Sequence, residues 1–340
     1  MKPRSFLISV AALVAFSGAA CGTMHASNSG GAAIPYGAPY KPAVAATGEV
    51  LQGSLVTPDG RARTYRLYIP SGLSTKRPLP LLIALHGGGG SGAQFEKISG
   101  FDGLAQANRF LVVYPDGTKT RGLLGGRVWN AGGCCGIAEQ ARENVNDVRF
   151  ISLLIDRLER QYHVDRKRVF VTGHSNGAML GLRLACQLSD KVDAVAVQSG
   201  TLFIGGSHPR HAVAVLEIHG SADQNVPIDG GKGPKDISGS VYPPPERGLE
   251  TLAASDGCRA GPLTFGDKKN HDLSYEVWRP CAAGTVVEWI KVAGASHAWM
   301  GHRAASILAR IVSRRLAGKP YMGFDSSAAV WSFLSAHPRR

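Results

Sequence analysis

Residues 173–177 read Gly-His-Ser-Asn-Gly and lie between a short apolar stretch and a helix-forming one. The preceding residues 168–172 (Arg-Val-Phe-Val-Thr) predict a strand, and the following residues 177–187 predict a helix. A strand that turns directly into a helix leaves no room for side chains two positions either side of the apex, so glycine fits there. Chance matches are common in a chain with 43 glycines, but the flanking strand and helix make this one informative. The pattern predicts a strained turn that exposes the hydroxyl of Ser175.

A second glycine-rich turn, residues 86–92 (His-Gly-Gly-Gly-Gly-Ser-Gly), follows an apolar strand at 79–85. Backbone N–H groups in such a turn suit a negatively charged oxygen, and we expect those of Gly88 and Asn176 to form an oxyanion hole. A phosphate-binding loop is the alternative. Against it, the turn carries no Gly-Lys-Ser/Thr, and no acidic residue is suitably placed for a ribose.

Two further polar residues follow strands later in the chain. Asp223 comes just after an apolar strand at 213–219, and His297 lies in the loop after a strand at 285–292. The order Ser, Asp, His, each at the carboxyl end of a strand, is the chain order of an α/β-hydrolase triad. Asp229 and His302 are the nearest substitutes, but each lies further from its strand end.

The three residues have complementary chemistry. Ser175 is the expected nucleophile, and His297 is the expected base that takes its proton and later acts as acid. Asp223 would accept a hydrogen bond from the other imidazole nitrogen of His297 and stabilise the imidazolium. The alternative for each residue is a turn-forming role in a glycine-rich loop.

The remaining polar residues indicate no cofactor. No His, Cys, Asp or Glu cluster has the spacing of a zinc or calcium site, so we expect neither a metal nor another cofactor. His86 and His219 each end a strand before a glycine and are expected to form hydrogen bonds at the sheet edge.

The first 21 residues are typical of an export signal. A short basic start precedes an apolar core at residues 6–16, too short to span a bilayer, and small residues then lead to Cys21. This resembles a bacterial lipobox and predicts that Cys21 is lipidated and anchors the protein to a membrane, although Gly18 departs from the usual leucine. Plain secretion is the alternative, and either way we expect an exported protein of the cell envelope or outside it.

Residues 22–48 are rich in Gly, Ala, Ser and Pro and predict a flexible tether of about 30 Å reach. Residues 49–340 then predict one catalytic domain of the α/β class, a mostly parallel twisted sheet with helices on both faces. The expected strands are 51–56 and 65–69 (a hairpin), 81–85, 110–114, 168–172, 193–197, 213–218 and 285–292, and the expected helices are 146–162, 177–187 and 324–337.

Two segments, residues 121–136 and 229–281, are candidates for shaping a substrate site. Residues 121–136 follow a strand and contain Trp129. A second tryptophan, Trp299, lies two residues after His297. Both indoles are candidates for stacking on substrate, with core packing as the alternative. Residues 229–281, rich in Gly, Pro and Lys, are interpreted as an insertion after the acid loop.

The cysteines fit an exported protein with two disulfides and one free thiol. We predict a Cys258–Cys281 bond, because both flank one hairpin-like region. The second predicted bond joins Cys134 or Cys135 to Cys186, and a vicinal Cys134–Cys135 bond is the alternative. We do not expect a catalytic cysteine.

The net charge is +13, and basic residues gather on one late helical stretch. They are Arg303, Arg310, Arg314, Arg315 and Lys319. For an exported protein this favours attraction to anionic envelope polymer or lipid over nucleic acid, which we do not expect as a partner. A solvated helix face is the alternative.

Together these motifs carry a family resemblance. The segments at 86–88, 129–135, 146–148, 173–179, 219–227 and 296–299 resemble the polyhydroxybutyrate depolymerase and feruloyl esterase family, from about residue 48 onward. The resemblance implies a Ser175–Asp223–His297 triad and hydrolysis of carboxylic esters, either of hydroxyalkanoate polyesters or of feruloyl and acetyl groups on polysaccharide. The family's His-x-Trp-Pro-Gly motif here reads His-Ala-Trp-Met-Gly at 297–301, followed by a basic insertion.

Three hypotheses follow. An exported serine esterase that acts through an acyl-enzyme is the first. An acyltransferase or peptidase on the same fold is the second, because a sugar hydroxyl as well as water can resolve an acyl-enzyme. A catalytically silent envelope-binding lipoprotein is the third.

Overall fold

The computed structural model describes residues 45–73, 77–120, 126–135, 145–205, 209–303 and 306–339. The predicted export signal, Cys21 and all of the predicted tether except residues 45–48 lie outside these residues. No helix within the described ranges is long and apolar enough to cross a bilayer.

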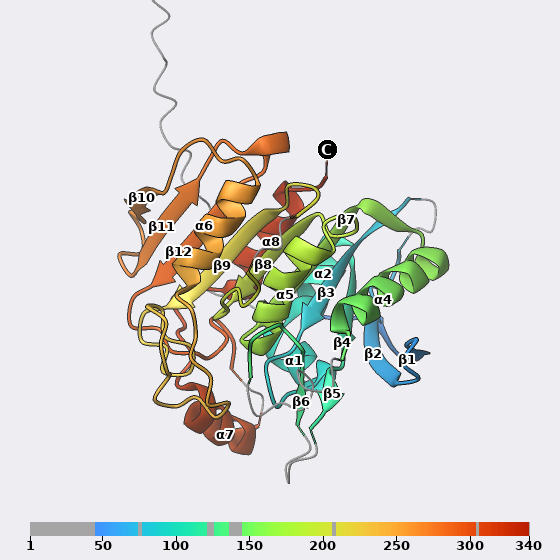
Figure 1. Cartoon of the computed structure of the whole chain (residues 1–340). Coiled ribbons are helices and arrows are strands. Elements are labelled where there is room, and N and C mark those ends of the chain that lie inside the picture. The colour runs from blue at the N-terminus through green and yellow to red at the C-terminus, as the bar shows by residue number, and fades with distance from the viewer. Residues whose placement is uncertain are drawn as a thin grey trace, which may run out of the picture. The chain divides into compact units, whose positions relative to one another are not determined.

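A sheet of ten strands organises the described part of the chain (Figure 1). Its middle strands run parallel, whereas the two strands at each edge pair antiparallel. In spatial order the strands are β1 (Glu49–Val56), β2 (Ala62–Ile69), β4 (Leu111–Pro115), β3 (Leu79–Leu85), β7 (Val164–His174), β8 (Ala194–Gln198), β9 (Ala214–Gly220), β12 (Val287–Val292), β11 (Leu273–Trp278) and β10 (Leu263–Gly266). Two short strands, β5 (Thr118–Lys119) and β6 (Arg127–Val128), form a separate ribbon.

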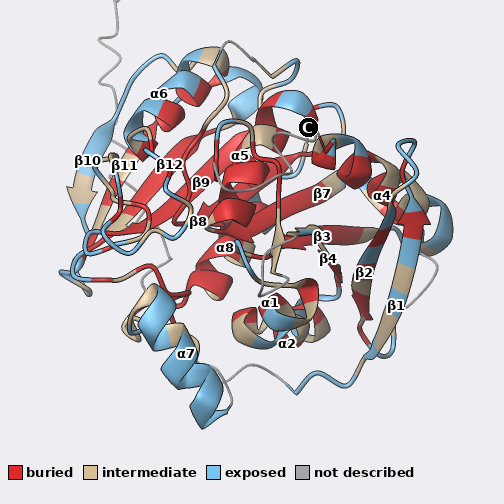
Figure 2. Cartoon of the chain, turned by 60° about the horizontal axis from the view of Figure 1, so that its bottom comes forward, coloured by how far each residue is buried: buried red, intermediate tan, exposed pale blue. Residues whose placement is uncertain are grey.

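Helices cover both faces of the sheet. Those described are α1 (Gly92–Ser99), α2 (Phe101–Asn108), α4 (Asp147–Tyr162), α5 (Asn176–Gln187), α6 (Pro245–Ser255), α7 (Ile307–Ala317) and α8 (Ser326–Ala336), with a short 3₁₀ turn η1 (Ala282–Gly284). Apolar residues of α4, α5 and α6 join the core on one face, and those of α1, α2 and α8 join it on the other. Figure 2 shows the resulting pattern: buried central strands, and a largely exposed α7.

The middle strands β3, β4 and β8 are largely apolar because both of their faces are covered. Along β3, Leu81, Ile83 and Leu85 pack on one face, while Leu82 and Ala84 pack on the other. This is the near-continuous apolar run expected of a buried parallel strand. Because parallel strands all end at the same edge, the loops after β3, β7, β9 and β12 gather there.

The α/β prediction is confirmed, and the strands and long helices fall within a few residues of their predicted ranges. The interpretation of residues 229–281 as an insertion was incomplete. They also supply α6 and the strands β10 and β11, which extend the sheet beyond β12. The segment 121–136 is described only from 126 to 135.

The cysteine pairing corrects one prediction. The Cys258–Cys281 bond is present as predicted, but the second bond is the vicinal Cys134–Cys135. Cys186 is a buried free thiol on α5, and burial raises its pKa to about 11. The expected pairing of Cys186 with Cys134 or Cys135 was therefore wrong, and Cys186 belongs to the apolar core.

A buried ion pair fastens the first strands to the active-site edge. Arg63 on β2 donates to the Asp147 carboxylate at the start of α4 across 2.6 Å, and the guanidinium lies 4.1 Å from the Phe150 ring centroid. The other Asp147 oxygen accepts from the backbone N–H of Asn130 at 2.7 Å. The side chains of Arg63 and Asp147 are 3% and 0% exposed. If one partner were removed, water would not reach the other charge to solvate it.

We expect Arg63→Ala to lower the free energy of unfolding by about 3–5 kcal/mol, because it leaves the Asp147 charge buried without a cation. The matched control is Arg166→Ala, which breaks an ion pair to Glu159 in which the Arg166 side chain is 80% exposed. That change should cost less than about 1 kcal/mol. Urea denaturation measures both, and equal losses would contradict a structural role for the buried pair.

Asp256 ends α6 and connects it to the sheet. Its carboxylate accepts from the backbone N–H of Val213, just before β9, at 3.1 Å, and its backbone carbonyl accepts from the N–H of Ala282. Burial raises the pKa of Asp256 to about 7, because the hydrogen bonds from Val213 and Thr285 offset only part of the lost hydration.

This shift predicts a pH dependence of stability. Between about pH 4 and about pH 7 the folded protein holds a proton on Asp256 that the unfolded chain has lost, so this group makes the protein less stable as the pH rises. Asp256→Asn removes the titration. The free energy of unfolding of wild type, measured relative to Asp256→Asn by urea denaturation, should therefore fall across this window. A constant difference would rule out the raised pKa.

Candidate active site

The turn between β7 and α5 has the geometry predicted from residues 173–177. Ser175 stands between the two elements with φ of 56°, a left-handed conformation that costs energy for a residue with a side chain. A β carbon added to Gly173 would lie 2.5 Å from the Gly177 carbonyl oxygen, and one added to Gly177 would lie 2.4 Å from the Leu85 carbonyl oxygen. Both glycines are therefore required by close backbone contacts.

His297 and Asp223 come together at the carboxyl ends of two neighbouring parallel strands, β12 and β9. The Nδ1 atom of His297 lies 2.7 Å from Oδ2 of Asp223, and both residues are buried. The other carboxylate oxygen accepts from the backbone N–H groups of Asn225 and Val226, each at 2.9 Å. The substitutes lie elsewhere, since His302 pairs with Asp325 and Asp229 is exposed.

The charge on Asp223 is stabilised by its neighbours. Burial alone would raise the pKa of this carboxyl group, but His297, His219 and the Val226 N–H outweigh that effect and hold the pKa at about 2. Asp223 is therefore an anion throughout the neutral pH range. An anionic partner at Nδ1 leaves the Nε2 atom of His297 to exchange protons.

His219 supports Asp223 from inside the sheet edge. Its Nδ1 lies 3.1 Å from Glu217 Oε1, and its Nε2 lies 2.9 Å from the Val226 carbonyl oxygen and 3.6 Å from Asp223 Oδ2. Both ring nitrogens face acceptors, which favours the doubly protonated ring. Burial lowers the pKa of His219, but the hydrogen bond to Glu217 and the two carboxylates raise it overall. The predicted hydrogen-bonding role of His219 is confirmed.

His174, directly before Ser175, holds the loop that carries His297. Its Nε2 donates to the His297 carbonyl oxygen at 2.7 Å, and the two ring centroids lie 4.8 Å apart. Burial and the nearby His297 lower the pKa of His174 to about 3, so the ring is neutral. Gln198, at the end of β8, holds the same loop through the Ala298 carbonyl oxygen and the Met300 N–H.

Ser175 shares this edge with the His297–Asp223 pair. Within the described residues the Ser175 hydroxyl forms no hydrogen bond to His297. Such bonds often form only when substrate is bound. The connection between the two residues in this structure runs through His174, which adjoins Ser175 in the chain and contacts His297.

The two predicted oxyanion donors are neighbours. A β carbon added to Gly88 would lie 3.5 Å from the Asn176 β carbon, and one added to Gly87 would lie 3.5 Å from the Ser175 β carbon. The glycine turn after β3 thus packs directly against the serine turn. The backbone N–H of Asn176 lies in the first turn of α5, where N–H groups have no acceptor within the helix.

The side chain of Asn176 is fixed on all sides. Its Oδ1 accepts from the Trp129 N–H at 2.7 Å, and its Nδ2 donates to the Trp129 carbonyl oxygen at 3.1 Å and contacts Cys135 Sγ at 3.4 Å. The vicinal disulfide and the Trp129 backbone therefore position Asn176, whose N–H is a predicted oxyanion donor. The sequence contained these residues but gave no sign that they met.

The two tryptophans do not have the predicted role. Trp129 has no exposed surface, and its indole N–H donates to the His86 carbonyl oxygen at 2.9 Å. Trp299 is also buried, donates to Ser327 Oγ and packs edge-on against Phe95. Substrate stacking is thus replaced by core packing, which holds the glycine turn and the His297 loop in place.

Two residues of the site were not predicted from the sequence. Gln198 belongs to no motif, and His174 lies inside the serine turn, where the sequence does not indicate the direction of its ring. Among the described residues no group of three or more His, Cys, Asp or Glu side chains is arranged to hold a metal ion.

A parallel sheet between helices, with Ser175, Asp223 and His297 at the carboxyl ends of its strands, defines an α/β-hydrolase. The chain superposes on the acetyl xylan esterase from Aspergillus awamori with a TM-score of 0.53 at 18% identity, covering 73% of this chain and 94% of that one. Residues 63–236 match the family model described as esterase PHB depolymerase. The chain belongs to this family, which confirms the resemblance drawn from its motifs.

Named relatives agree with this assignment. The chain is 26% identical over 239 residues to the bifunctional acetylxylan esterase/xylanase of Neocallimastix patriciarum, covering 70% of this chain and 31% of that protein. It is 32% identical over 175 residues to feruloyl esterase C of Emericella nidulans, covering 50% of this chain and 58% of that protein. The chain thus spans less than two thirds of the length of either relative.

The geometry of the serine turn makes a direct prediction. Gly177→Ala should displace the turn from the strand that ends at Leu85, because the added carbon would meet two carbonyl oxygens at 2.4 and 2.5 Å. We expect loss of ester hydrolysis and a fall of a few kcal/mol in the free energy of unfolding. Gly205→Ala is the control, since nothing lies within 4 Å of its added carbon. Full activity of Gly177→Ala would contradict this account of the turn.

Proposed function

We propose that this protein is an exported serine esterase that hydrolyses carboxylic esters through Ser175, His297 and Asp223. The observation that carries the proposal is the 2.7 Å contact between His297 Nδ1 and Asp223 Oδ2 on the edge where Ser175 stands half-buried at a strained turn. Membership of an esterase family supports the same conclusion.

The proposed reaction has two stages. Ser175 Oγ attacks the ester carbonyl carbon while its proton passes to His297 Nε2, and the Asp223 carboxylate stabilises the imidazolium. The backbone N–H groups of Gly88 and Asn176 bind the negative oxygen of the tetrahedral intermediate, and each such donor is typically worth about 3–4 kcal/mol of barrier. The intermediate collapses as His297 protonates the leaving alkoxide, which gives an acyl-enzyme and the free alcohol.

Water resolves the acyl-enzyme by the reverse pattern. His297 takes a proton from water, the hydroxide attacks the acyl carbon, and Ser175 Oγ leaves with the proton from His297. The released acid is the second product. His174 remains neutral throughout and keeps the loop of His297 aligned without adding a competing charge.

The proposed substrates are esters linked to a polymer. Relatives named acetylxylan esterase and feruloyl esterase support acetyl or feruloyl esters on polysaccharide. The family description equally supports hydroxyalkanoate polyesters. Export of the protein and lipidation of Cys21 remain proposals from the sequence.

The test is hydrolysis of p-nitrophenyl esters from acetate to octanoate, and of methyl ferulate, by wild type and Ser175→Ala. We expect activity in wild type and a loss of roughly 10⁵-fold or more in the variant. The preferred acyl chain gives the size of the acyl pocket.

Ser54→Ala is the matched control. Ser54 is an exposed serine on the edge strand β1, and its change should leave kcat close to wild type. Equal activity of Ser175→Ala and wild type would exclude the proposed nucleophile. A wild type that hydrolyses none of these esters and is not labelled at Ser175 by an organophosphonate would exclude the esterase.

A further inference from the structure

Helix α7 concentrates exposed apolar side chains. The exposed fractions of its isoleucine, leucine and valine side chains lie between 48% and 74%. They are Ile307, Leu308, Ile311, Val312 and Leu316. No residue of α7 is buried, although the helix is amphipathic.

Helix α7 turns its apolar side to solvent, whereas a surface helix usually turns its polar side outward. Ser313 and Ala317, one turn apart, are its half-buried residues. With about 100° between successive residues, the apolar positions lie around the opposite side, away from the protein body. A surface helix normally packs its apolar side on the core. Here the fold itself makes no use of that side.

A neighbouring loop carries further exposed apolar residues. Asn225 Nδ2 donates to the Lys235 carbonyl oxygen and to the Leu316 carbonyl oxygen, so this loop and the end of α7 meet at one residue. In the loop Ile237 and Val241 are 75% and 70% exposed. We call the apolar residues of α7 together with Ile237 and Val241 the α7 surface.

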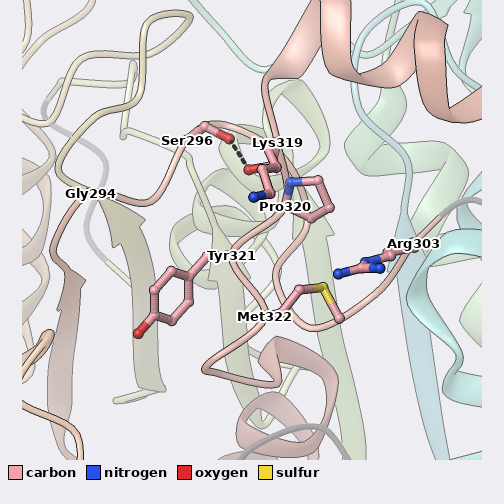
Figure 3. Close-up of a pocket in the computed structure, with 7 residues that line it drawn as sticks. All are labelled: Gly294, Ser296, Arg303, Lys319, Pro320, Tyr321 and Met322. Atoms are coloured by element: carbon pink, nitrogen blue, oxygen red, sulfur yellow. Dashed lines mark hydrogen bonds between the residues drawn. The ribbon is translucent and has the colours of Figure 1, made fainter.

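The same region is strongly basic. Residues 303–319 contain the five basic residues noted above and no Asp or Glu. Two of them, Arg303 and Lys319, line a cavity of about 430 Å³ beside the carboxyl end of α7 (Figure 3). Neither forms an ion pair within the described residues. The cavity also includes Ser296, whose Oγ donates to the Lys319 carbonyl oxygen at 2.8 Å.

The α7 surface adjoins the active site on two sides. Asn225, which contacts α7, also donates its backbone N–H to Asp223. Ser296, which contacts Lys319, directly precedes His297. A partner seated on α7 therefore lies next to the loops that carry two of the triad residues.

We infer that the α7 surface docks on a membrane that contains anionic lipid, with the apolar side chains inserted at the headgroup boundary and the basic residues at the phosphates. An outward apolar stripe beside basic residues is the composition of a helix that lies in a membrane interface. A second copy of the chain fits poorly, because two such basic surfaces repel each other. A neutral polyester would supply no counter-charge to Arg314 and Arg315. An anionic polysaccharide would leave the apolar side chains in water.

The experiment is flotation of the full chain carrying Cys21→Ser with vesicles of phosphatidylglycerol and phosphatidylcholine, and with phosphatidylcholine alone. The Cys21→Ser change removes the predicted lipid, and the rest of the leader is the same in every variant. We expect binding to the anionic vesicles that weakens with salt. Arg314→Gln with Arg315→Gln should weaken this binding roughly thirtyfold, and Leu308→Gln with Ile311→Gln roughly tenfold.

Val56→Gln with Leu263→Gln is the matched control, because these apolar residues are 69% and 46% exposed on β1 and β10, away from α7. It should bind as the parent does. Three outcomes overturn the proposal: no preference for anionic vesicles, full binding by the Leu308 and Ile311 variant, or a dimer that this variant abolishes. None depends on ester hydrolysis, so a failed esterase assay leaves this test intact.

Discussion

The strained backbone at Ser175 is the constraint on which the site depends. A side-chain residue at φ of 56° costs of order 1–3 kcal/mol, and it persists only where the surroundings fix it. Here α5 is packed so closely that β carbons added at Gly177 and Gly181 would lie within 3 Å of neighbouring atoms. The helix cannot relax the turn without leaving β3, β7 and β8. The packing that buries α5 thus holds Ser175 at the apex of the turn, with Asn176 directly after it.

A row of buried ionisable groups runs from β9 to the loop that carries His297. Glu217, His219, Asp223 and His297 follow one another through contacts of 2.7 to 3.6 Å. Burying any one charge alone would be costly, but acid and base alternate along the row, so each charge has an opposite neighbour. The row keeps Asp223 ionised, and in the proposed reaction it gives the imidazolium at His297 an anion to face. Neutral His174 completes the support from the other side.

The sequence predicted most of what depends on local pattern. The serine turn, the parallel strands and the carboxyl-edge positions of Asp223 and His297 all follow from periodicity and chain order. The sequence did not predict the contacts between segments that are distant in the chain. Strand β10 has only four residues, three of them exposed, so its pattern was weak. Asn176 contacts Trp129 and the vicinal disulfide across more than forty residues of chain. Each tryptophan also donates to a partner more than twenty residues away in the chain.

Helix α7 lies where this chain departs from the motif of its family after His297. The backbone N–H of Gly301 donates to the Tyr321 carbonyl oxygen, so the excursion that carries α7 begins and ends at one point. An inserted segment whose two ends meet adds little strain to the core, because the sheet and α8 are joined as they would be without it. The apolar side chains of α7 are therefore not needed by the fold. Their cost in water is explained if they contact something outside it, and the basic residues beside them indicate that this partner is anionic.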